Sequence, residues 1–187
     1  MVVRPSSVSG TMNSVRKTSF CDMLVLCISL AVTTIDQVVK RIIFSNLNLG
    51  QRIPVIPDFF NITYGQNTGA AWGIFQGGNA WLIALSLVVL TVLFFFRSHF
   101  FSDGVLNKVA MGLMIGGILG NLIDRVHHGF VVDFLDFIFW GWHFPAFNVA
   151  DSGICVGVAL YMLAQFISGR HESKPVTTAA NTGDGAA

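Results

Sequence analysis

Carboxyl side chains gather in one short part of an otherwise apolar chain. Residues 121–151 hold four of the ten acidic residues, namely Asp124, Asp133, Asp136 and Asp151. An ionisable group beside hydrocarbon is costly, so each of these carboxyls is a candidate functional group. Two carboxyls held close together share one proton, because burial and the neighbouring negative charge both raise a carboxyl pKa. Such a pair can hydrolyse a peptide bond, with one Asp as the base that activates water and the other as the acid.

The surroundings of these carboxyls leave open which two of them form a pair. Asp133 and Asp136 lie among Val, Leu and Phe in VVDFLDF, so both are candidates for a raised pKa. Asp151 lies just inside an apolar run, which argues against a purely solvated role. Asp124 and Arg125 end another apolar run, and for these two alone an anchor at the membrane interface is the simpler interpretation.

Other chemistries have weaker support in the sequence. His127, His128 and His143 could join carboxylates at a metal, but their spacing matches no recognised zinc site. Ser152 and Cys155 have no nearby His that is placed to activate them as nucleophiles. We therefore expect neither a metal nor another cofactor. The net charge of +1 gives no reason to expect nucleic acid as a partner.

Membrane helices are expected to position these residues. The chain is 53% hydrophobic and only 11% charged, whereas about a quarter of a soluble domain is charged. Apolar runs predict four transmembrane helices, at residues 20–39, 80–96, 109–123 and 149–167. Pro, Gly and the alternating FFNITY indicate short strands in residues 41–79. The predicted fold is an α-helical membrane protein with a small β-rich extracytoplasmic platform between helices 1 and 2.

The rest of the chain is divided around this membrane domain at residues 20–168. Residues 1–19 and 169–187 are polar and predicted to be disordered tails. No small-x-small site follows Ala31, so a retained first helix is favoured over a cleaved signal peptide. Gly112 and Gly116 have the spacing that lets helices pack closely in lipid. Trp81 is predicted to be an interface anchor, and the three cysteines are predicted to be small buried hydrophobes: Cys21, Cys27 and Cys155.

Basic residues predict the orientation of the chain in the membrane. With the N-terminus inside, the two tails and the second loop carry seven of them: Arg4, Arg16, Lys17, Arg97, Lys108, Arg170 and Lys174. The other side carries four: Lys40, Arg41, Arg52 and Arg125. The positive-inside rule then places both termini in the cytoplasm and the acidic stretch at the outer leaflet.

Two further features could support the acidic site. Asp36 and Lys40, in DQVVK, are spaced to pair on one helix face. This pair is either an ordinary ion pair at the interface or a brace behind the site, and the sequence leaves both open. Asn67 begins the motif NTGAAWGIF, whose small residues allow close approach of another backbone, and its amide could bind an extended peptide.

The motifs closely resemble those of the lipoprotein signal peptidase family, also called signal peptidase II. The resemblance covers about residues 23–166 and rests on GNLIDR (120–125), VVDFLDF with Asp133, HFPAFNVADS (143–152) and the upstream NTGAAWG. It implies a bacterial inner-membrane aspartic endopeptidase. Such an enzyme cleaves diacylglyceryl-modified prolipoproteins just before the lipidated cysteine. Trp72 stands where a smaller aromatic residue is common in the family, which is a mild departure.

The resemblance also implies roles for individual residues. It places the catalytic pair at Asp133 and Asp151, with Asp124 as an orienting residue, although physical reasoning alone leaves Asp124 open as the first catalytic acid. It implies supporting or substrate-binding roles for a larger set: Asn121, Arg125, Asn148, Asp124, Asn67, Gly69, Asp36 and Lys40. The expected partners are diacylglyceryl-prolipoprotein substrates and membrane lipid, for an enzyme that acts as a monomer without metal.

Two other classes of protein compete with a peptidase. Carboxyls in a membrane also mark the ion paths of proton-coupled transporters and channels. Transporters more often show broken helices and internal repeats, whereas these acids cluster at one face. A non-catalytic membrane scaffold is the third possibility, and it predicts that replacing Asp133 or Asp151 by Asn affects little beyond stability.

Overall fold

The computed structural model describes residues 9–69, 77–97 and 104–172. Trp72 and most of the motif that begins at Asn67 lie outside these ranges. The described helices are α1 (Ser9–Asn46), α2 (Asn79–Phe95), α4 (Val105–His128) and α5 (Val149–Glu172). The described strands are β1 (Arg52–Ile56), β2 (Phe60–Asn67), β3 (Val131–Phe139) and β4 (Trp142–His143). The prediction of apolar helices with a small sheet is confirmed.

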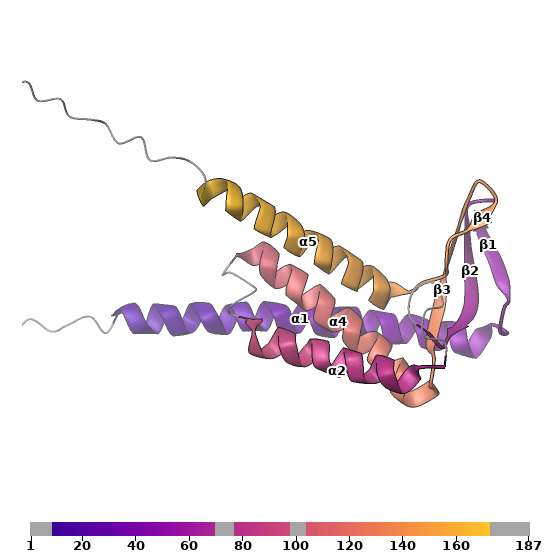
Figure 1. The fold of residues 1–187 in the computed structure, drawn as a ribbon, viewed down its shortest axis with the longest axis horizontal. Helices are drawn as coiled ribbons and strands as arrows, with labels where there is room; N and C mark the ends of the chain where they lie inside the picture. Colours follow the sequence, from indigo (N-terminus) through magenta and orange to yellow (C-terminus); the bar gives the residue numbers. More distant parts are fainter. Residues whose placement is uncertain (1–8, 70–76, 98–103, 173–187) are drawn as a thin grey trace, which may run out of the picture.

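Helix α4 lies at the centre of the helix bundle, where it packs against α1, α2 and α5 (Figure 1). Its glycines make this close packing possible, as predicted. A Cβ at Gly112 would lie 2.8 Å from the Cβ of Ile28, and one at Gly116 would lie 2.7 Å from the carbonyl oxygen of Ser29. Any larger residue at these two positions would therefore force α1 and α4 apart.

The sheet lies at one end of the bundle and joins two separate parts of the chain (Figure 1). Its strand order is β1-β2-β3-β4, with antiparallel pairing throughout. Strands β1 and β2 connect α1 to α2, whereas β3 and β4 connect α4 to α5. The predicted confinement of the strands to residues 41–79 was therefore wrong. VVDFLDFIF lacks strict alternation, and its pairing with β2 and β4 makes it a strand.

The helices are longer than predicted at their ends. Helix α1 begins at Ser9 and ends at Asn46, so residues 9–19 are helical rather than disordered, and residues 41–46 are helical rather than part of the platform. Helix α5 continues to Glu172, beyond the predicted boundary at residue 168. Extending an existing helix costs little once its first turn has formed, and no proline interrupts these segments.

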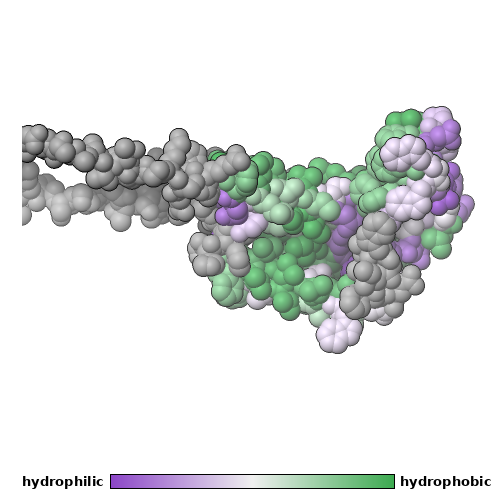
Figure 2. Space-filling model, turned by 45° about the horizontal axis from the view of Figure 1, so that its top comes forward, coloured by the Kyte–Doolittle hydropathy of each residue, from purple (hydrophilic) through white to green (hydrophobic). Residues whose placement is uncertain are grey.

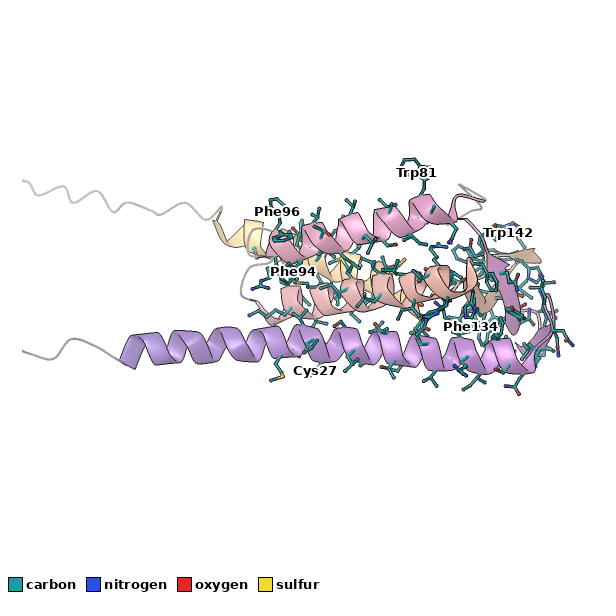
Figure 3. All side chains as sticks on the ribbon, turned by 90° about the horizontal axis from the view of Figure 1, so that it is seen from below. Cys27, Trp81, Phe94, Phe96, Phe134 and Trp142 are labelled. Atoms are coloured by element: carbon teal, nitrogen blue, oxygen red, sulfur yellow. The ribbon has the colours of Figure 1, made fainter. Side chains whose placement is uncertain are left out.

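The surface of the bundle suits a membrane. Among the residues that the structure describes, three helices are long and apolar enough to cross one, at Met23–Asn46, Val105–His128 and Val149–Ser168, and the apolar helix Asn79–Phe95 is shorter. Hydrophobic residues cover the bundle, whereas hydrophilic residues gather toward the sheet (Figure 2). Trp81 is 78% exposed and points away from the bundle, as an interface anchor would (Figure 3).

The prediction that the cysteines are buried was wrong for the two whose side chains are described. Cys27 and Cys155 are free thiols and both are exposed. Figure 3 shows Cys27 pointing outward from α1. An outward position on an apolar helix suits a small hydrophobic side chain equally well in a membrane, because the surroundings there are apolar too.

Candidate active site

A cleft of about 980 Å³ opens where the sheet meets the ends of α4 and α5. Asp133 enters it from β3, and Asp151 enters it from the first turn of α5. Other predicted site residues line the same cleft: Asn67, Gly69, Asn121 and Arg125. The fold thus brings together carboxyls and amides from four elements or their flanking loops.

Asp133 is buried in the wall of this cleft and is only 4% exposed. Its Oδ1 accepts a hydrogen bond from Asn148 Nδ2 at 2.8 Å, and its Oδ2 accepts one from Asn67 Nδ2 at 3.0 Å. Burial and the negative charge of Asp151 raise the pKa of Asp133 to about 7, although the two amide hydrogen bonds favour its charged form. Asp133 can therefore hold a proton near neutral pH.

Asp151 is held by amides on both sides. Its Oδ1 accepts a hydrogen bond from Asn121 Nδ2 at 2.7 Å, and its Oδ2 accepts one from the Asn148 N–H at 3.2 Å. The Asp151 N–H donates in return to Asn148 Oδ1 at 2.9 Å. This reciprocal pair, three residues apart, is a capping box at the start of α5. Asn148 therefore contacts both carboxyls, since its side-chain Nδ2 donates to Asp133 and its backbone N–H donates to Asp151.

Lys40 forms a buried network behind the cleft. Its Nζ lies 2.7 Å from Asp36 Oδ2 and 3.1 Å from Asp124 Oδ2, and it donates to Asn121 Oδ1 at 2.9 Å. Asp36 Oδ1 accepts a hydrogen bond from the Ala150 N–H at 2.8 Å. Of the two interpretations left open for the Asp36–Lys40 pair, the geometry favours a brace, since the pair is buried and bonded to a residue of the cleft.

Asp124 faces away from the cleft. It lines a second cavity of about 580 Å³ with Lys40 and other residues of α1. Its Oδ1 accepts a hydrogen bond from Gln37 Nε2 at 2.8 Å, and its Oδ2 accepts one from the Val132 N–H at 3.0 Å. These bonds tie α4 to α1 and to the start of β3. Sequence reasoning missed Gln37, although its position next to Asp36 in DQVVK was a signal.

Arg125 connects α4 to the loop that follows β2. Its Nη2 donates to the carbonyl oxygen of Gly69 at 3.0 Å, and the Gly69 N–H donates to Asn67 Oδ1 at 3.0 Å. The amide of Asn67 is thereby turned so that its Nδ2 reaches Asp133. The Nη1 of Arg125 is buried and has no hydrogen-bond partner among the described residues.

Asp136 does not line the cleft, so the open possibility that it pairs with Asp133 fails. Residues three apart in a strand point to opposite faces of the sheet. Burial raises the pKa of Asp136, but hydrogen bonds from His143 and Asn61 and the charges of His143 and Arg52 outweigh burial and hold this pKa below its ordinary value.

The histidines and Ser152 are placed without the geometry of a metal site or an activated nucleophile. His128 stacks on Phe44 and Phe130. No group of three His, Cys, Asp or Glu side chains that could hold a metal occurs within residues 9–69, 77–97 and 104–172. The hydroxyl of Ser152 donates to the carbonyl oxygen of Asn148 at 2.9 Å.

Comparison with known proteins agrees with the resemblance of the motifs. The family described as Signal peptidase (SPase) II matches residues 28–167. The chain belongs to the signal peptidase II family. This membership makes it a protease and gives no support to the alternative of a proton-coupled transporter or channel.

Curated members of the family are similar over most of their length. The lipoprotein signal peptidase of Syntrophotalea carbinolica is 43% identical, and the match covers 80% of this chain and 96% of that protein. The lipoprotein signal peptidase of Bacillus pumilus is 40% identical, with 83% and 100% covered.

A solved structure titled as a bacterial membrane enzyme matches the fold with a TM-score of 0.75. It is 38% identical in sequence, and the match covers 81% of this chain and 93% of that one. The signal peptidase II fold described above is thus that of a bacterial membrane enzyme.

Proposed function

We propose that this protein is a membrane aspartic endopeptidase that removes signal peptides from diacylglyceryl-modified prolipoproteins by cleaving just before the lipidated cysteine. One observation carries the catalytic assignment: Asp133 and Asp151 line the same cleft, and Asn148 contacts both. The family assignment and the names of the relatives support the substrate class.

The proposed reaction is general acid–base hydrolysis without a metal. The raised pKa of Asp133 makes its carboxyl the holder of the shared proton near neutral pH. Asp151 then removes a proton from water while the carboxyl of Asp133 polarises the scissile carbonyl. The water oxygen bonds to the carbonyl carbon and forms a tetrahedral intermediate. This intermediate collapses when the carboxyl of Asp133 gives its proton to the peptide nitrogen, the C–N bond breaks and the amine leaves; the proton taken by Asp151 restores the shared proton of the pair. Asn121 and Asn148 orient Asp151 throughout through their hydrogen bonds.

The remaining residues of the site receive binding and supporting roles. Arg125 has a buried Nη1 that is available to a substrate carbonyl, while its Nη2 holds Gly69. Asn67 orients Asp133 and lies in the part of the cleft that an extended peptide would enter. Asp36, Lys40 and Asp124 keep Asn121 in place from behind.

The proposed placement is a bacterial inner membrane, crossed four times within the peptidase domain at residues 20–168. Helix α2 has 17 residues and, at 1.5 Å per residue, is about 25 Å long, close to the thickness of the hydrocarbon core. Both termini then lie in the cytoplasm, and the cleft lies at the outer leaflet. The diacylglyceryl chains of the substrate stay in the lipid, which orients the peptide bond at the carboxyls. One chain contains the whole site, which favours a monomer.

The test is cleavage of a diacylglyceryl-modified prolipoprotein in detergent by the wild type and by Asp133→Asn, Asp151→Asn and Asp124→Asn. We expect the first two variants to lose activity by a factor on the order of 10³ or more, since each removes a reacting proton site. The Asp124→Asn enzyme should still cleave, and EDTA should have no effect on the wild type. An active Asp133→Asn enzyme beside an inactive Asp124→Asn enzyme would move the first catalytic acid to Asp124.

A further inference from the structure

Asp136 is a buried carboxylate that the proposed reaction does not use. Its Oδ2 accepts a hydrogen bond from Asn61 Nδ2 at 2.9 Å and lies 3.2 Å from Arg52 Nε. Its Oδ1 lies 2.8 Å from His143 Nδ1. These partners belong to β2, β1 and β4, so one carboxylate on β3 contacts all three other strands. We refer to Asp136 and His143, which join β3 to β4, as the sheet clasp.

The clasp matters most for β4, which is the weakest part of the sheet. Strand β4 has two residues and lies at the edge of the sheet, where it pairs with β3 at two positions. The next residue, Phe144, adds one backbone hydrogen bond, from its N–H to the carbonyl oxygen of Phe137 at 2.8 Å. So short a ladder is marginal by itself. The contact between His143 and the buried Asp136 adds a side-chain link between β3 and β4 to this short ladder.

The neighbours of His143 form part of the cleft. Successive side chains of a strand point to opposite faces, so Trp142 and Phe144 point away from Asp136, and both line the cleft. Their rings meet edge to face with centroids 6.1 Å apart, and Phe144 meets Phe147 in the same way at 5.9 Å. Figure 3 shows Trp142 at the sheet end of the bundle. These three rings form an aromatic wall beside Asp133.

We propose that Asp136 and His143 are positioning residues that hold Trp142 and Phe144 in the cleft, where these two rings bind the apolar part of the substrate. The clasp lies on one face of the sheet and the aromatic wall on the other, so the clasp acts on binding through β4 and does not touch the reacting atoms. This inference rests on the proposed function, because it takes the cleft to be the substrate site.

The test compares His143→Ala, His143→Gln and Arg52→Ala in the cleavage of a diacylglyceryl-modified prolipoprotein. Loss of one hydrogen bond to a buried charge should raise KM about five- to tenfold in His143→Ala, with kcat within about twofold of wild type. The Gln side chain can donate to Asp136 and should restore most of the wild-type KM. Arg52 contacts the same carboxylate and is partly exposed like His143, at 58% against 43%, but it lies on β1, at the opposite edge of the sheet from β4. Arg52→Ala is therefore the matched control, with KM within about twofold of wild type.

A binding measurement separates this inference from the proposed reaction. The dissociation constant of a fluorescent lipopeptide substrate is measured in the Asp133→Asn background with and without His143→Ala, so that no cleavage is needed. A five- to tenfold weaker binding, about as large as the KM effect, supports the clasp. Unchanged binding in His143→Ala, or equal weakening in Arg52→Ala, would overturn it. An active Asp133→Asn enzyme would instead overturn the assigned reaction, and the binding comparison would then be made with a non-cleavable lipopeptide of the same sequence.

Discussion

Asp133 and Asp136 lie three positions apart on one strand and yet suit two different chemical roles. Asp133 shares its cleft with a second carboxyl, and burial and the charge of Asp151 raise its pKa to about 7. Asp136 has Arg52 and His143 as partners on the opposite face, and its pKa stays below the ordinary value despite burial. The same side chain is thus suited to proton transfer at one position and to fixed negative charge at the other.

The pKa of Asp133 predicts how stability depends on pH. An Asp in the unfolded chain has a pKa of about 3.9, so between pH 4 and 7 the folded state binds more protons at Asp133 than the unfolded state does. The free energy of unfolding should therefore fall as pH rises through this window, by up to about 4 kcal/mol from this residue. Asp133→Asn should flatten that fall.

Denaturation in detergent at several values of pH measures the effect, with Asp136→Asn as the comparison. The pKa of Asp136 is lowered, so the contribution of Asp136 to stability is present above the unfolded pKa and is lost as pH falls through the folded one. Identical pH profiles for wild type and Asp133→Asn would contradict the assigned burial of a protonated Asp133.

Among the elements, α1 and α4 are joined by buried charge as well as by close packing. Lys40 of α1 contacts Asp124 and Asn121 of α4, and Asp36 of α1 contacts the backbone at the start of α5. A buried ion pair adds little net stability when it is complete, because desolvation offsets attraction. Removing one partner of the pair is costly, because the other charge is then buried without a partner.

Lys40→Met should therefore destabilise the protein by about 3–5 kcal/mol, since it leaves Asp36 and Asp124 buried without their cation. It should also lower activity, because Asn121 loses one of the bonds that orient it toward Asp151. Arg41→Met is the matched control, because Arg41 is the exposed neighbour on the same helix. Chemical denaturation in detergent measures the free energy of unfolding of the two variants. Equal values for Lys40→Met and Arg41→Met would contradict the buried network around Lys40.

At the scale of the whole molecule, the sheet lies at one end of the helix bundle, opposite the start of α1 and the end of α5 (Figure 1). Both β1–β2 and β3–β4 lie at the end of the bundle that holds the cleft, while the start of α1 and the end of α5 lie at the other end (Figure 1). This arrangement agrees with both termini on one side of a membrane and with the cleft at the opposite surface.

Cysteine labelling tests the proposed orientation. In a background with Cys21, Cys27 and Cys155 replaced by Ser, we expect Val55→Cys to react with a membrane-impermeant maleimide in spheroplasts. Val55 is exposed on β1, at the cleft end of the bundle. Gly104→Cys, at the exposed start of α4, should react only after the membrane is permeabilised. The reverse pattern would invert the orientation.

The sequence by itself determined the apolar helices and the family, because long apolar runs and ordered motifs can be recognised without any tertiary contact. The resemblance of the motifs also implied supporting roles for Asn121, Asn148 and Lys40, and these roles stay predictions. The sequence also predicted the close packing at Gly112 and Gly116, since small residues at that spacing have a direct steric meaning.

The tertiary structure alone decided which polar residues meet. The sheet is half built from residues 131–143, and the pairing of β3 with β2 follows from contacts between segments more than sixty residues apart, such as Asn67 with Val131. That pairing sets the register of β3, and the register turns Asp133 into the cleft and Asp136 away from it. Local sequence specifies each carboxyl, but only long-range strand pairing specifies its face.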